Sequence, residues 1–300
     1  MALVETPEQL DFALADLPRT ALPRRVWMAD PAEFLVAYAI NPHMRGDDGA
    51  LKHVDRQRAR EQWQALRERL EALGLVVHVV PPLAGHPDLV FCANQALPVA
   101  ADVARDGRAR YVPSNMRWPE RRGEVPHVAR ALEAAGLERL ELATTERFEG
   151  MGDGLWHPGR RLLWAGVGPR SSREAWRELA LRLDLPVVAL ELVEPAFYHL
   201  DTALALLSED TCLWLPDALG PASRELVERL IPRRIEADLH EAHTLLACNA
   251  CCPDGRNVLI QRGAERTSAR LRDAGFAVHE LETGEFLKSG GSVFCMKLLG

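Results

Sequence analysis

A cysteine near the end of the chain, directly behind a glycine pair, is the residue best suited to covalent chemistry. It stands in the run Lys288-Ser-Gly-Gly-Ser-Val-Phe-Cys295-Met-Lys. Glycine lets a backbone or a ligand approach closely, and a cysteine becomes a strong nucleophile once a neighbouring group lowers its pKa. Taken alone, Cys295 is also compatible with the usual fate of a free cysteine, that of a small buried hydrophobic residue. A catalytic thiol therefore requires a base elsewhere in the chain.

Two other motifs carry acid and base groups. Glu149 stands in the run Phe148-Glu-Gly-Met-Gly-Asp153, which we interpret as a turn entering a strand, with Asp153 as a structural residue. His199 and Asp201 are two positions apart, so on a strand their side chains point to the same face. In that arrangement the carboxylate would fix the imidazole tautomer and raise its pKa.

Together with Asn94, these groups favour a planar, cationic, nitrogen-rich substrate. A guanidinium presents its donors in one plane and binds carboxylates in bidentate fashion. The carboxylates that would clamp it are Asp88, Glu149 and Asp201. Cys295 would attack the central carbon, and His199 would protonate the departing amine and then activate water. The predicted reaction is hydrolytic cleavage of a carbon–nitrogen bond.

Helices that would position these residues are predicted from apolar residues at a 3.6-residue period and from their cap and stop signals. They cover residues 54–73, 125–135, 172–183, 223–230 and 264–274. A short segment rich in valine and leucine follows each helix. Strands are therefore predicted at residues 75–80, 137–142, 186–193, 235–239 and 276–281.

The region after each of these strands has a common pattern, in which a polar residue precedes two apolar stretches. The period is roughly 45 to 55 residues, which is within the range of radially repeated folds. Five copies of a strand-strand-helix-strand unit predict a single α/β domain over residues 1–300, closed into a pseudo-fivefold ring. A doubly wound α/β sheet is the alternative, because it also alternates strands and helices. We favour the ring because the polar residues of every unit would converge on its axis.

The acidic composition argues against a nucleic-acid or anionic-membrane partner, since the net charge is -7 and the pI is about 5.8. No apolar run reaches the ~18 residues that a membrane span needs. Residues 1–10 hold two glutamates and a proline where a secretory signal is basic and then apolar. The six cysteines are interpreted as free thiols. We therefore expect a cytoplasmic enzyme that acts on a small molecule.

The cluster Cys248-Asn-Ala-Cys251-Cys252 is similar to half of a metal site. No second cysteine pair accompanies it, and a structural zinc needs four ligands. The glycine pairs at positions 150 and 152 and at 166 and 168 lack the rest of a phosphate or dinucleotide fingerprint. We predict neither a metal ion nor a nucleotide.

Five ordered motifs lie between Asn41 and Cys295, and the similarity that they carry extends from Met28 to Leu299. They are Asn41-Pro-His-Met44, Pro87-Asp-Leu-Val-Phe-Cys-Ala-Asn94, Phe148-Glu-Gly-Met-Gly-Asp153, Phe197-Tyr-His-Leu-Asp-Thr202 and Glu285-Phe-Leu-Lys-Ser-Gly-Gly-Ser-Val-Phe-Cys295. Together they resemble the guanidino-group-modifying enzymes of the pentein fold, most closely the dimethylarginine dimethylaminohydrolase-like branch that includes bacterial arginine dihydrolases. The resemblance implies a five-bladed α/β propeller and a covalent thiouronium intermediate on Cys295, with no metal or organic cofactor.

The resemblance also implies a role for each matched residue. Cys295 is similar to the nucleophile, His199 to the general acid and base, and Glu149 to the carboxylate that orients the histidine or the guanidinium. The substrate-binding positions are matched by Asn41, Asp88, Asn94 and Asp201. The arginines that hold the α-carboxylate of the substrate are matched by Arg121 and Arg170, with Arg122 as an alternative to Arg121.

The choice of substrate turns on Asn94. The resemblance implies an aspartate here in dimethylargininases and arginine deiminases, and an asparagine in arginine dihydrolases. A neutral amide can donate to a ureido oxygen as well as accept from a guanidinium. Citrulline from a first hydrolysis would then be cut again, so that arginine yields ornithine, carbon dioxide and two ammonia. Phe294 departs from the histidine or lysine often found before the nucleophile in the family, which leaves the substrate open.

Other activities remain open. A dimethylargininase or arginine deiminase would stop at citrulline, and an amidinotransferase would pass the amidino group to an amine. A non-catalytic binding protein is the alternative from another class, as in the ribosome anti-association factor that shares the fold, although it predicts empty catalytic positions. The expected partner is a small guanidino substrate, and a homo-oligomer is compatible with the sequence.

Overall fold

Residues 3–300, which are those that the computed structural model describes, form a mixed α/β structure with five small β-sheets. The strands are β1 (Leu3–Val4), β2 (Arg25–Ala29), β3 (Val76–Val80), β4 (Ala96–Val99), β5 (Arg110–Pro113), β6 (Glu138–Arg139), β7 (Gly154–Trp156), β8 (Leu163–Val167), β9 (Val187–Glu191), β10 (Leu204–Leu206), β11 (Thr211–Trp214), β12 (Arg233–Glu236), β13 (Asn257–Gln261), β14 (Ala277–Leu281) and β15 (Leu298–Leu299). The helices are α1 (Arg56–Ala72), α2 (Pro119–Arg122), α3 (Glu124–Ala134), α4 (Gly150–Asp153), α5 (Arg173–Leu183), α6 (Pro221–Leu230), α7 (Leu239–Leu245), α8 (Glu265–Asp273) and α9 (Gly284–Leu287).

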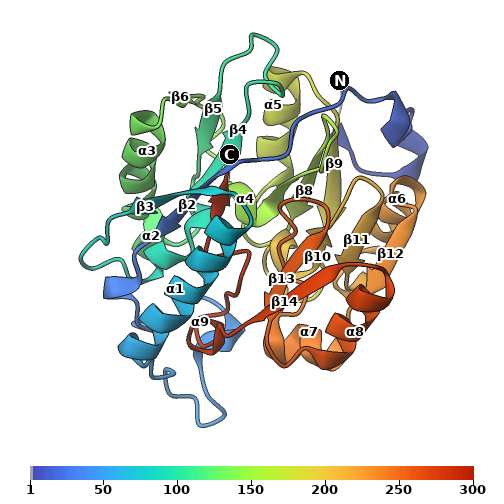
Figure 1. Cartoon of the computed structure of the whole chain (residues 1–300). Coiled ribbons are helices and arrows are strands. Elements are labelled where there is room, and N and C mark those ends of the chain that lie inside the picture. Colours follow the sequence, from blue (N-terminus) through green and yellow to red (C-terminus); the bar gives the residue numbers. More distant parts are fainter. Residues whose placement is uncertain (1–2) are drawn as a thin grey trace.

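One connectivity recurs in all of these sheets. In four of them, a first strand is antiparallel to a second strand, and a helix then leads to a third strand that is parallel to the second. These units are β4-β5-α3-β6, β7-β8-α5-β9, β10-β11-α6-β12 and β15-β2-α1-β3. In the fifth sheet, α8 connects the parallel strands β13 and β14, and an antiparallel bridge between Cys251 and Leu259 takes the place of the first strand. Helices α3, α5, α6 and α8 lie at the periphery of the molecule (Figure 1).

The last strand, β15, joins the sheet of β2 and β3. Leu298 of β15 is the antiparallel partner of Trp27 in β2. The red C-terminal segment therefore runs through the interior beside β2 (Figure 1). Cys295 precedes this strand and is buried. The end of the chain is thus held in the core instead of fraying.

The predicted helices agree with the structure to within a few residues, because their apolar faces are covered. In α1 the buried positions include Trp63, Leu66 and Leu70, which share one face of the helix. The side chain of Asp55 caps this helix by accepting a hydrogen bond from the amide of Arg58 at 3.0 Å. The apolar stripe and the cap therefore fix both the position and the start of α1.

Two of the predicted strands differ from the structure in length or position. Strand β6 covers 138–139 instead of 137–142. The amide of Leu140 still donates to the carbonyl of Tyr111, but the next ladder bond would need an amide from Pro113, which has none. Strand β12 covers 233–236 instead of 235–239, because Asp238 caps helix α7 by accepting from the amides of His240 and Glu241.

Two local interpretations of the site motifs need correction. The Glu149 motif does lead into a strand, β7, but residues Gly150–Asp153 form the single helical turn α4. His199 and Asp201 do not lie on a strand. His199 precedes a 3₁₀ turn at Leu200–Thr202, so a spacing of two does not bring their side chains to one face.

Large apolar side chains fill the space between the sheets and the helices, including the fully buried indoles of Trp27, Trp164 and Trp176. Among residues 3–300, no helix is long and apolar enough to cross a membrane. The buried polar side chains include most of the residues singled out for chemistry: Asp88, Asn94, Arg121, Glu149, Arg170, His199 and Asp201.

Candidate active site

The segment before Cys295 is shaped by Gly290. This residue has φ +85, in the left-handed region that glycine adopts without strain. A Cβ atom there would lie 2.8 Å from both the Asn41 Oδ1 and the Tyr198 hydroxyl. The Tyr198 hydroxyl donates to the carbonyl of Gly290 at 2.6 Å. The glycine therefore admits the neighbouring side chains that close the wall of the site.

The Cys295 thiol makes two polar contacts. It donates to Asp201 Oδ2 at 3.2 Å, and Asn249 Nδ2 donates to its sulfur at 3.1 Å. Burial raises the pKa of the Cys295 thiol well above its ordinary value, and the negative charge of Asp201 adds to this effect. The thiol form is therefore the resting form at neutral pH.

Asp201 is buried without an arginine partner. Burial raises the pKa of its carboxyl group to about 7, although the thiol of Cys295, the charge of Lys297 and a hydrogen bond from Asn249 oppose the rise. Its second oxygen, Oδ1, has no hydrogen-bond partner within residues 3–300. This carboxyl group thus titrates near neutrality and has one oxygen free to accept a donor.

Glu149 has the opposite environment. Its Oε2 contacts Arg170 Nη1 at 2.9 Å and His199 Nε2 at 2.8 Å, and its Oε1 accepts from the amide of Arg117 at 2.9 Å. Burial raises the pKa of Glu149, but Arg170 and His199 outweigh it, and the net pKa is about 2. Glu149 is therefore a permanent anion that holds the imidazole of His199.

Asp88, Asn94 and Arg121 form a second polar wall. Asp88 Oδ1 accepts from Ser289 Oγ at 3.0 Å, and Asn94 Oδ1 accepts from Arg121 Nη1 at 2.8 Å. Asp88 Oδ2 and Asn94 Nδ2 have no partner in the part of the chain that the structure describes. The wall thus presents one unpaired acceptor beside one unpaired donor.

Arg121 is bound mainly to protein groups. Its Nε and Nη2 lie 3.0 and 2.9 Å from Glu124 Oε2, and Nη2 also donates to the carbonyls of Asp88 and Phe91. Arg121 lines the cavity, whereas Arg122 does not and donates to the carbonyl of Met116. The structure thus favours Arg121 over Arg122 as the site residue. Among the side chains of the predicted site residues, Arg121 donates to that of Asn94.

Asn41 and Arg170 stand at the outer side of the cavity. Asn41 Nδ2 donates to the carbonyl of Ser289 at 2.9 Å, and Arg170 lies over the ring of Tyr198 at 4.8 Å. The enclosed space is about 10 Å³, which is roughly room for one water molecule. Asn41, Arg170 and Tyr198 also line an adjoining outer cavity of about 370 Å³. Entry of a substrate therefore requires these outer side chains to move.

Gly152 lets two of the predicted residues approach each other. A Cβ atom at Gly152 would lie 2.3 Å from Asn94 Nδ2 and 3.2 Å from the His199 ring. Asn94 and His199 therefore both lie against Gly152, in the space that a side chain at this position would fill. Asn41, Asp88, Asn94, Arg121 and Arg170 line one cavity with Cys295, and Asp201 contacts the thiol. Glu149, instead of Asp201, contacts the histidine, and it is joined to this cavity through Arg170.

Sequence reasoning missed Asn249, Tyr198 and Lys297. Asn249 stands in the Cys248-Asn-Ala-Cys251-Cys252 cluster, which drew attention only as a metal half-site. Across residues 3–300, no group of three or more His, Cys, Asp or Glu side chains is placed to hold a metal ion. The available signal for Asn249 was a polar residue in an apolar stretch at the start of the fifth unit.

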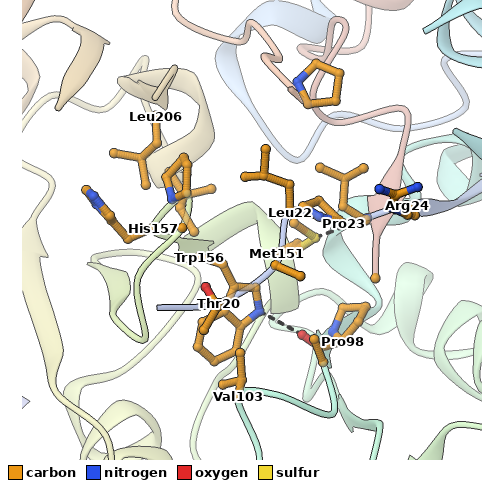
Figure 2. Close-up of a pocket in the computed structure, with 18 of the residues that line it drawn as sticks. Thr20, Leu22, Pro23, Arg24, Pro98, Val103, Met151, Trp156, His157 and Leu206 are labelled. Atoms are coloured by element: carbon orange, nitrogen blue, oxygen red, sulfur yellow. Dashed lines mark hydrogen bonds between the residues drawn. The ribbon is translucent and has the colours of Figure 1, made fainter. Parts of the chain in front are cut away.

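A larger, mainly apolar cavity of about 340 Å³ lies on the other side of the Phe294–Cys295 segment. Phe294 lines it, whereas Cys295 lines the polar cavity. Figure 2 shows Leu22, Met151 and Trp156 around this space, with the Trp156 indole donating to the carbonyl of Pro98. Six of the predicted site residues line the small polar cavity, and none lines this apolar one.

Comparisons with known proteins agree with this geometry. The profile of the family described as "N,N dimethylarginine dimethylhydrolase, eukaryotic" matches residues 30–298. A dimethylarginine dimethylaminohydrolase of Mycobacterium tuberculosis is 40% identical over 93% of this chain and 87% of its own length. The bifunctional arginine dihydrolase/ornithine cyclodeaminase ArgZ of Synechocystis is 35% identical over 91% of this chain, which spans 37% of ArgZ.

Solved structures extend the likeness to the fold. The N-terminal domain of ArgZ, an arginine dihydrolase solved with its substrate, superposes with a TM-score of 0.83 at 34% identity, covering 92% of this chain and 97% of that domain. A complex of AgrE with L-arginine gives 0.82 at 35% identity, covering 92% of this chain and 40% of AgrE. A dimethylarginine dimethylaminohydrolase gives 0.75 at 22% identity, covering 93% and 100%, which shows the common fold alone. The chain therefore belongs to the dimethylarginine dimethylaminohydrolase family of hydrolases, within the pentein superfamily.

Proposed function

We propose that this chain is an arginine dihydrolase that uses Cys295 to cleave guanidino carbon–nitrogen bonds. L-Arginine and water would give citrulline and ammonia, and citrulline and a second water would give ornithine, carbon dioxide and a second ammonia. Relatives named as arginine dihydrolases match over more than nine-tenths of the chain. We also propose that residues 1–300 are one catalytic domain, in which the five repeated sheets surround a pseudo-fivefold axis as a five-bladed propeller.

The choice of substrate rests on the two unpaired atoms of the wall formed by Asp88, Asn94 and Arg121. Arg121 occupies the carbonyl oxygen of Asn94, so the free amide group of Asn94 is a donor. Asp88 Oδ2 beside it is an acceptor. An acceptor suits the N–H groups of both guanidinium and urea, while the amide donor suits the oxygen that only the ureido group of citrulline presents. This pairing supports a second hydrolysis after the first.

The proposed chemistry begins with activation of the thiol. A guanidinium that binds beside Cys295 would stabilise the thiolate and lower the thiol pKa. The thiol proton would pass to His199 as the sulfur attacks the guanidinium carbon, and His199 would give this proton to the amine that leaves, so that a thiouronium remains on Cys295. His199 would next take a proton from water, whose oxygen attacks the same carbon and releases the thiol. Glu149 keeps the imidazole in place for both proton transfers.

Asp88 and Asp201 are the proposed acceptors for the guanidinium, each with one free oxygen in residues 3–300. Arg170 and Asn41, at the outer side of the cavity, are the proposed contacts for the α-amino acid part of the substrate. Arg121 is also a proposed substrate residue, and its hydrogen bond to Asn94 means that it would act by fixing the amide as well as by its charge.

Dimethylargininase is the second candidate, because the Mycobacterium tuberculosis relative with that name is 40% identical. The two candidates differ in products. The purified protein is incubated with L-arginine, with citrulline and with asymmetric dimethylarginine, and ornithine, citrulline, dimethylamine and ammonia are quantified. We expect one ornithine and two ammonia per arginine, and turnover of citrulline as a separate substrate.

Other outcomes would replace the proposal. Citrulline with a single ammonia would identify an arginine deiminase. Release of dimethylamine without turnover of arginine would identify a dimethylargininase. Amidino transfer to glycine would identify a transferase. Binding of arginine without any product would identify a non-catalytic binding protein. A Cys295→Ser variant, checked for an unchanged melting temperature, is the control for each assay.

A further inference from the structure

We propose that Asn249 is a positioning residue that holds the Cys295 segment in place and donates a hydrogen bond to the Cys295 thiolate. The inference rests on the proposed function of Cys295 as a nucleophile. Asn249 is buried, with only 1% of its surface exposed, and lies between α7 and the bridge at Cys251. It comes from a segment that is separate in sequence from every motif of the site.

The carbonyl oxygen of the Asn249 side chain gathers the amides of the nucleophile segment. Its Oδ1 accepts from the backbone N–H groups of Ser292 at 3.1 Å, Phe294 at 3.1 Å and Cys295 at 3.2 Å. The segment 292–295 has no helix or strand ladder to satisfy these donors. A buried amide without a partner is destabilising. The Phe294 amide also donates to the backbone carbonyl of Asn249 at 3.1 Å. The Asn249 side chain therefore satisfies the Ser292 and Cys295 amides, shares the Phe294 amide with its own carbonyl, and fixes where the backbone places Cys295.

The amide nitrogen of the same side chain makes the contact to sulfur. Its Nδ2 donates to Cys295 Sγ at 3.1 Å and to the carbonyl of Asp201 at 3.1 Å. A hydrogen bond to the charged form of a group favours that form. The Asp201 carboxyl group acts in the opposite direction, since it accepts from the thiol and carries negative charge. Asn249 thus supplies a donor that remains useful when the thiol proton has left.

Both ends of the amide are needed for this role. An aspartate at position 249 would keep the volume and the oxygen acceptor for the three amides, but it would lose the donors to sulfur and to Asp201. It would also add a negative charge beside the thiol. A serine would also lose the amide donor, and its shorter side chain would no longer reach the backbone amides, but it adds no charge. The aspartate variant therefore combines the loss of the donor with an added charge while it keeps the acceptor, and the serine variant shows the loss without an added charge.

The test measures the rate of Cys295 alkylation by iodoacetamide from pH 6 to 11 without substrate, followed by mass spectrometry of the C-terminal peptide. We expect the apparent thiol pKa to rise by about 1 to 2 units in Asn249→Asp and by about 0.5 to 1 unit in Asn249→Ser. With L-arginine at neutral pH, kcat should fall by about 10-fold or more in Asn249→Asp, with a much smaller change in KM. Asn115→Asp is the matched control, because Asn115 is exposed and donates to the backbone at Thr145 and Glu146.

A wild-type thiol pKa in either folded variant would overturn the proposal. Failure of both variants to fold would assign Asn249 to structure alone and would also overturn the donor role. Alkylation needs no turnover, so it tests Asn249 even if the protein hydrolyses no guanidino compound. Absence of turnover in the wild-type protein would instead contradict the proposed function.

Discussion

Glu149 and Asp201 are both fully buried carboxyl groups of one site, yet their pKa values move in opposite directions. Glu149 lies between Arg170 and His199, and its pKa is about 2. Asp201 contacts the neutral thiol of Cys295, and its pKa is about 7. Burial raises the pKa of both, so the difference comes from Arg170 and His199, which lower the pKa of Glu149.

This difference suits the two sides of the site to separate tasks. The negative charge of Glu149 is paired with Arg170 before any substrate binds, and Glu149 fixes the orientation of His199. The Asp201 side lacks a paired cation in residues 3–300, and a guanidinium would supply one. The Glu149 side is therefore preorganised, while the Asp201 carboxylate gains a cationic partner only when substrate binds.

The strongest way to break the comparison is Glu149→Gln. This change leaves Arg170 and His199 without their shared anion inside the protein. We expect the free energy of unfolding to fall by about 3–5 kcal/mol, because one partner of a buried ion pair is removed. kcat/KM with L-arginine should fall by about 10²–10⁴-fold through the loss of acid–base catalysis. Urea unfolding and product assays measure the two effects.

Glu146→Gln is the control for this variant, because Glu146 lies nearby in the chain and is exposed. Its stability and activity should match the wild-type protein. A Glu149→Gln protein as stable and as active as Glu146→Gln would show that the anion does not hold His199.

Asp201→Asn should give a smaller loss of activity. It removes a carboxylate without leaving an arginine unpaired, and we expect kcat/KM to fall by about 10–100-fold, the value of one or two hydrogen bonds to a charged group. Asp217→Asn is the matched control, because Asp217 is exposed. An Asp201→Asn protein that loses as much stability as Glu149→Gln would contradict the difference between the two regions.

The pH dependence of stability should have opposite signs for the two carboxyl groups. For Asp201 the folded pKa, about 7, is above the unfolded value of about 3.9, so its stabilising contribution is lost as pH rises through 7. For Glu149 the folded pKa, about 2, is below the unfolded value of about 4.3, so its contribution is lost as pH falls toward 2. Unfolding of the wild-type protein and Asp201→Asn at pH 5.5 and 8 measures this.

We expect the stability of Asp201→Asn relative to the wild-type protein to increase between these two pH values. The increase should be about 1.4 kcal/mol for each pH unit below the folded pKa of Asp201. A difference that is independent of pH would show that Asp201 does not titrate near neutrality. Asp217→Asn should show no such trend.

Lys297→Met should give the smallest effect. Lys297 is fully buried, its Nζ has no hydrogen-bond partner among residues 3–300, and it lies 3.3 Å from the centre of the Phe294 ring. Burial lowers the pKa of Lys297, so stability rises with pH up to the unfolded pKa of about 10.4. We expect Lys297→Met to stabilise the protein by about 1 kcal/mol at pH 7, with less gain at pH 9.5.

Thermal unfolding at both pH values measures this effect. Because Lys297 also lowers the pKa of Asp201, the variant should shift the titration of Asp201 upward. A gain in stability that grows with pH would contradict the account of Lys297 as a buried amine that resists protonation.

The helices could be predicted from the sequence because their signals are local. In α1, Trp63, Leu66 and Leu70 recur at helical spacing and are buried in the structure. The form of the His199 motif could not be predicted in this way. Over so few residues, alternation does not distinguish a strand from the 3₁₀ turn at Leu200–Thr202, and the turn decides where Asp201 points.

Site residues that stand in sequence motifs could be predicted. Residues that reach the site only through tertiary packing could not. Cys295, His199 and Glu149 stand in recognisable motifs. Cys295 lines the polar cavity, and the Glu149–His199 pair is joined to that cavity through Arg170. Asn249 lies 46 residues from Cys295 in a cysteine-rich stretch, so only the packing of the fifth unit against the chain end reveals its role. The pKa values of Glu149 and Asp201 shift in opposite directions, and this likewise depends on the fold, because Arg170 contacts Glu149 and not Asp201.

The central claim is that Cys295 attacks a guanidino carbon. The most direct measurement mixes the wild-type protein with L-arginine, quenches it with acid within milliseconds to seconds, and determines the intact mass and the mass of the C-terminal peptide. We predict a covalent adduct on Cys295 with the mass of the thiouronium intermediate, formed and lost at rates compatible with turnover, and no adduct in Cys295→Ser. Turnover of arginine by Cys295→Ser at the wild-type rate, or an adduct on another residue, would contradict the account.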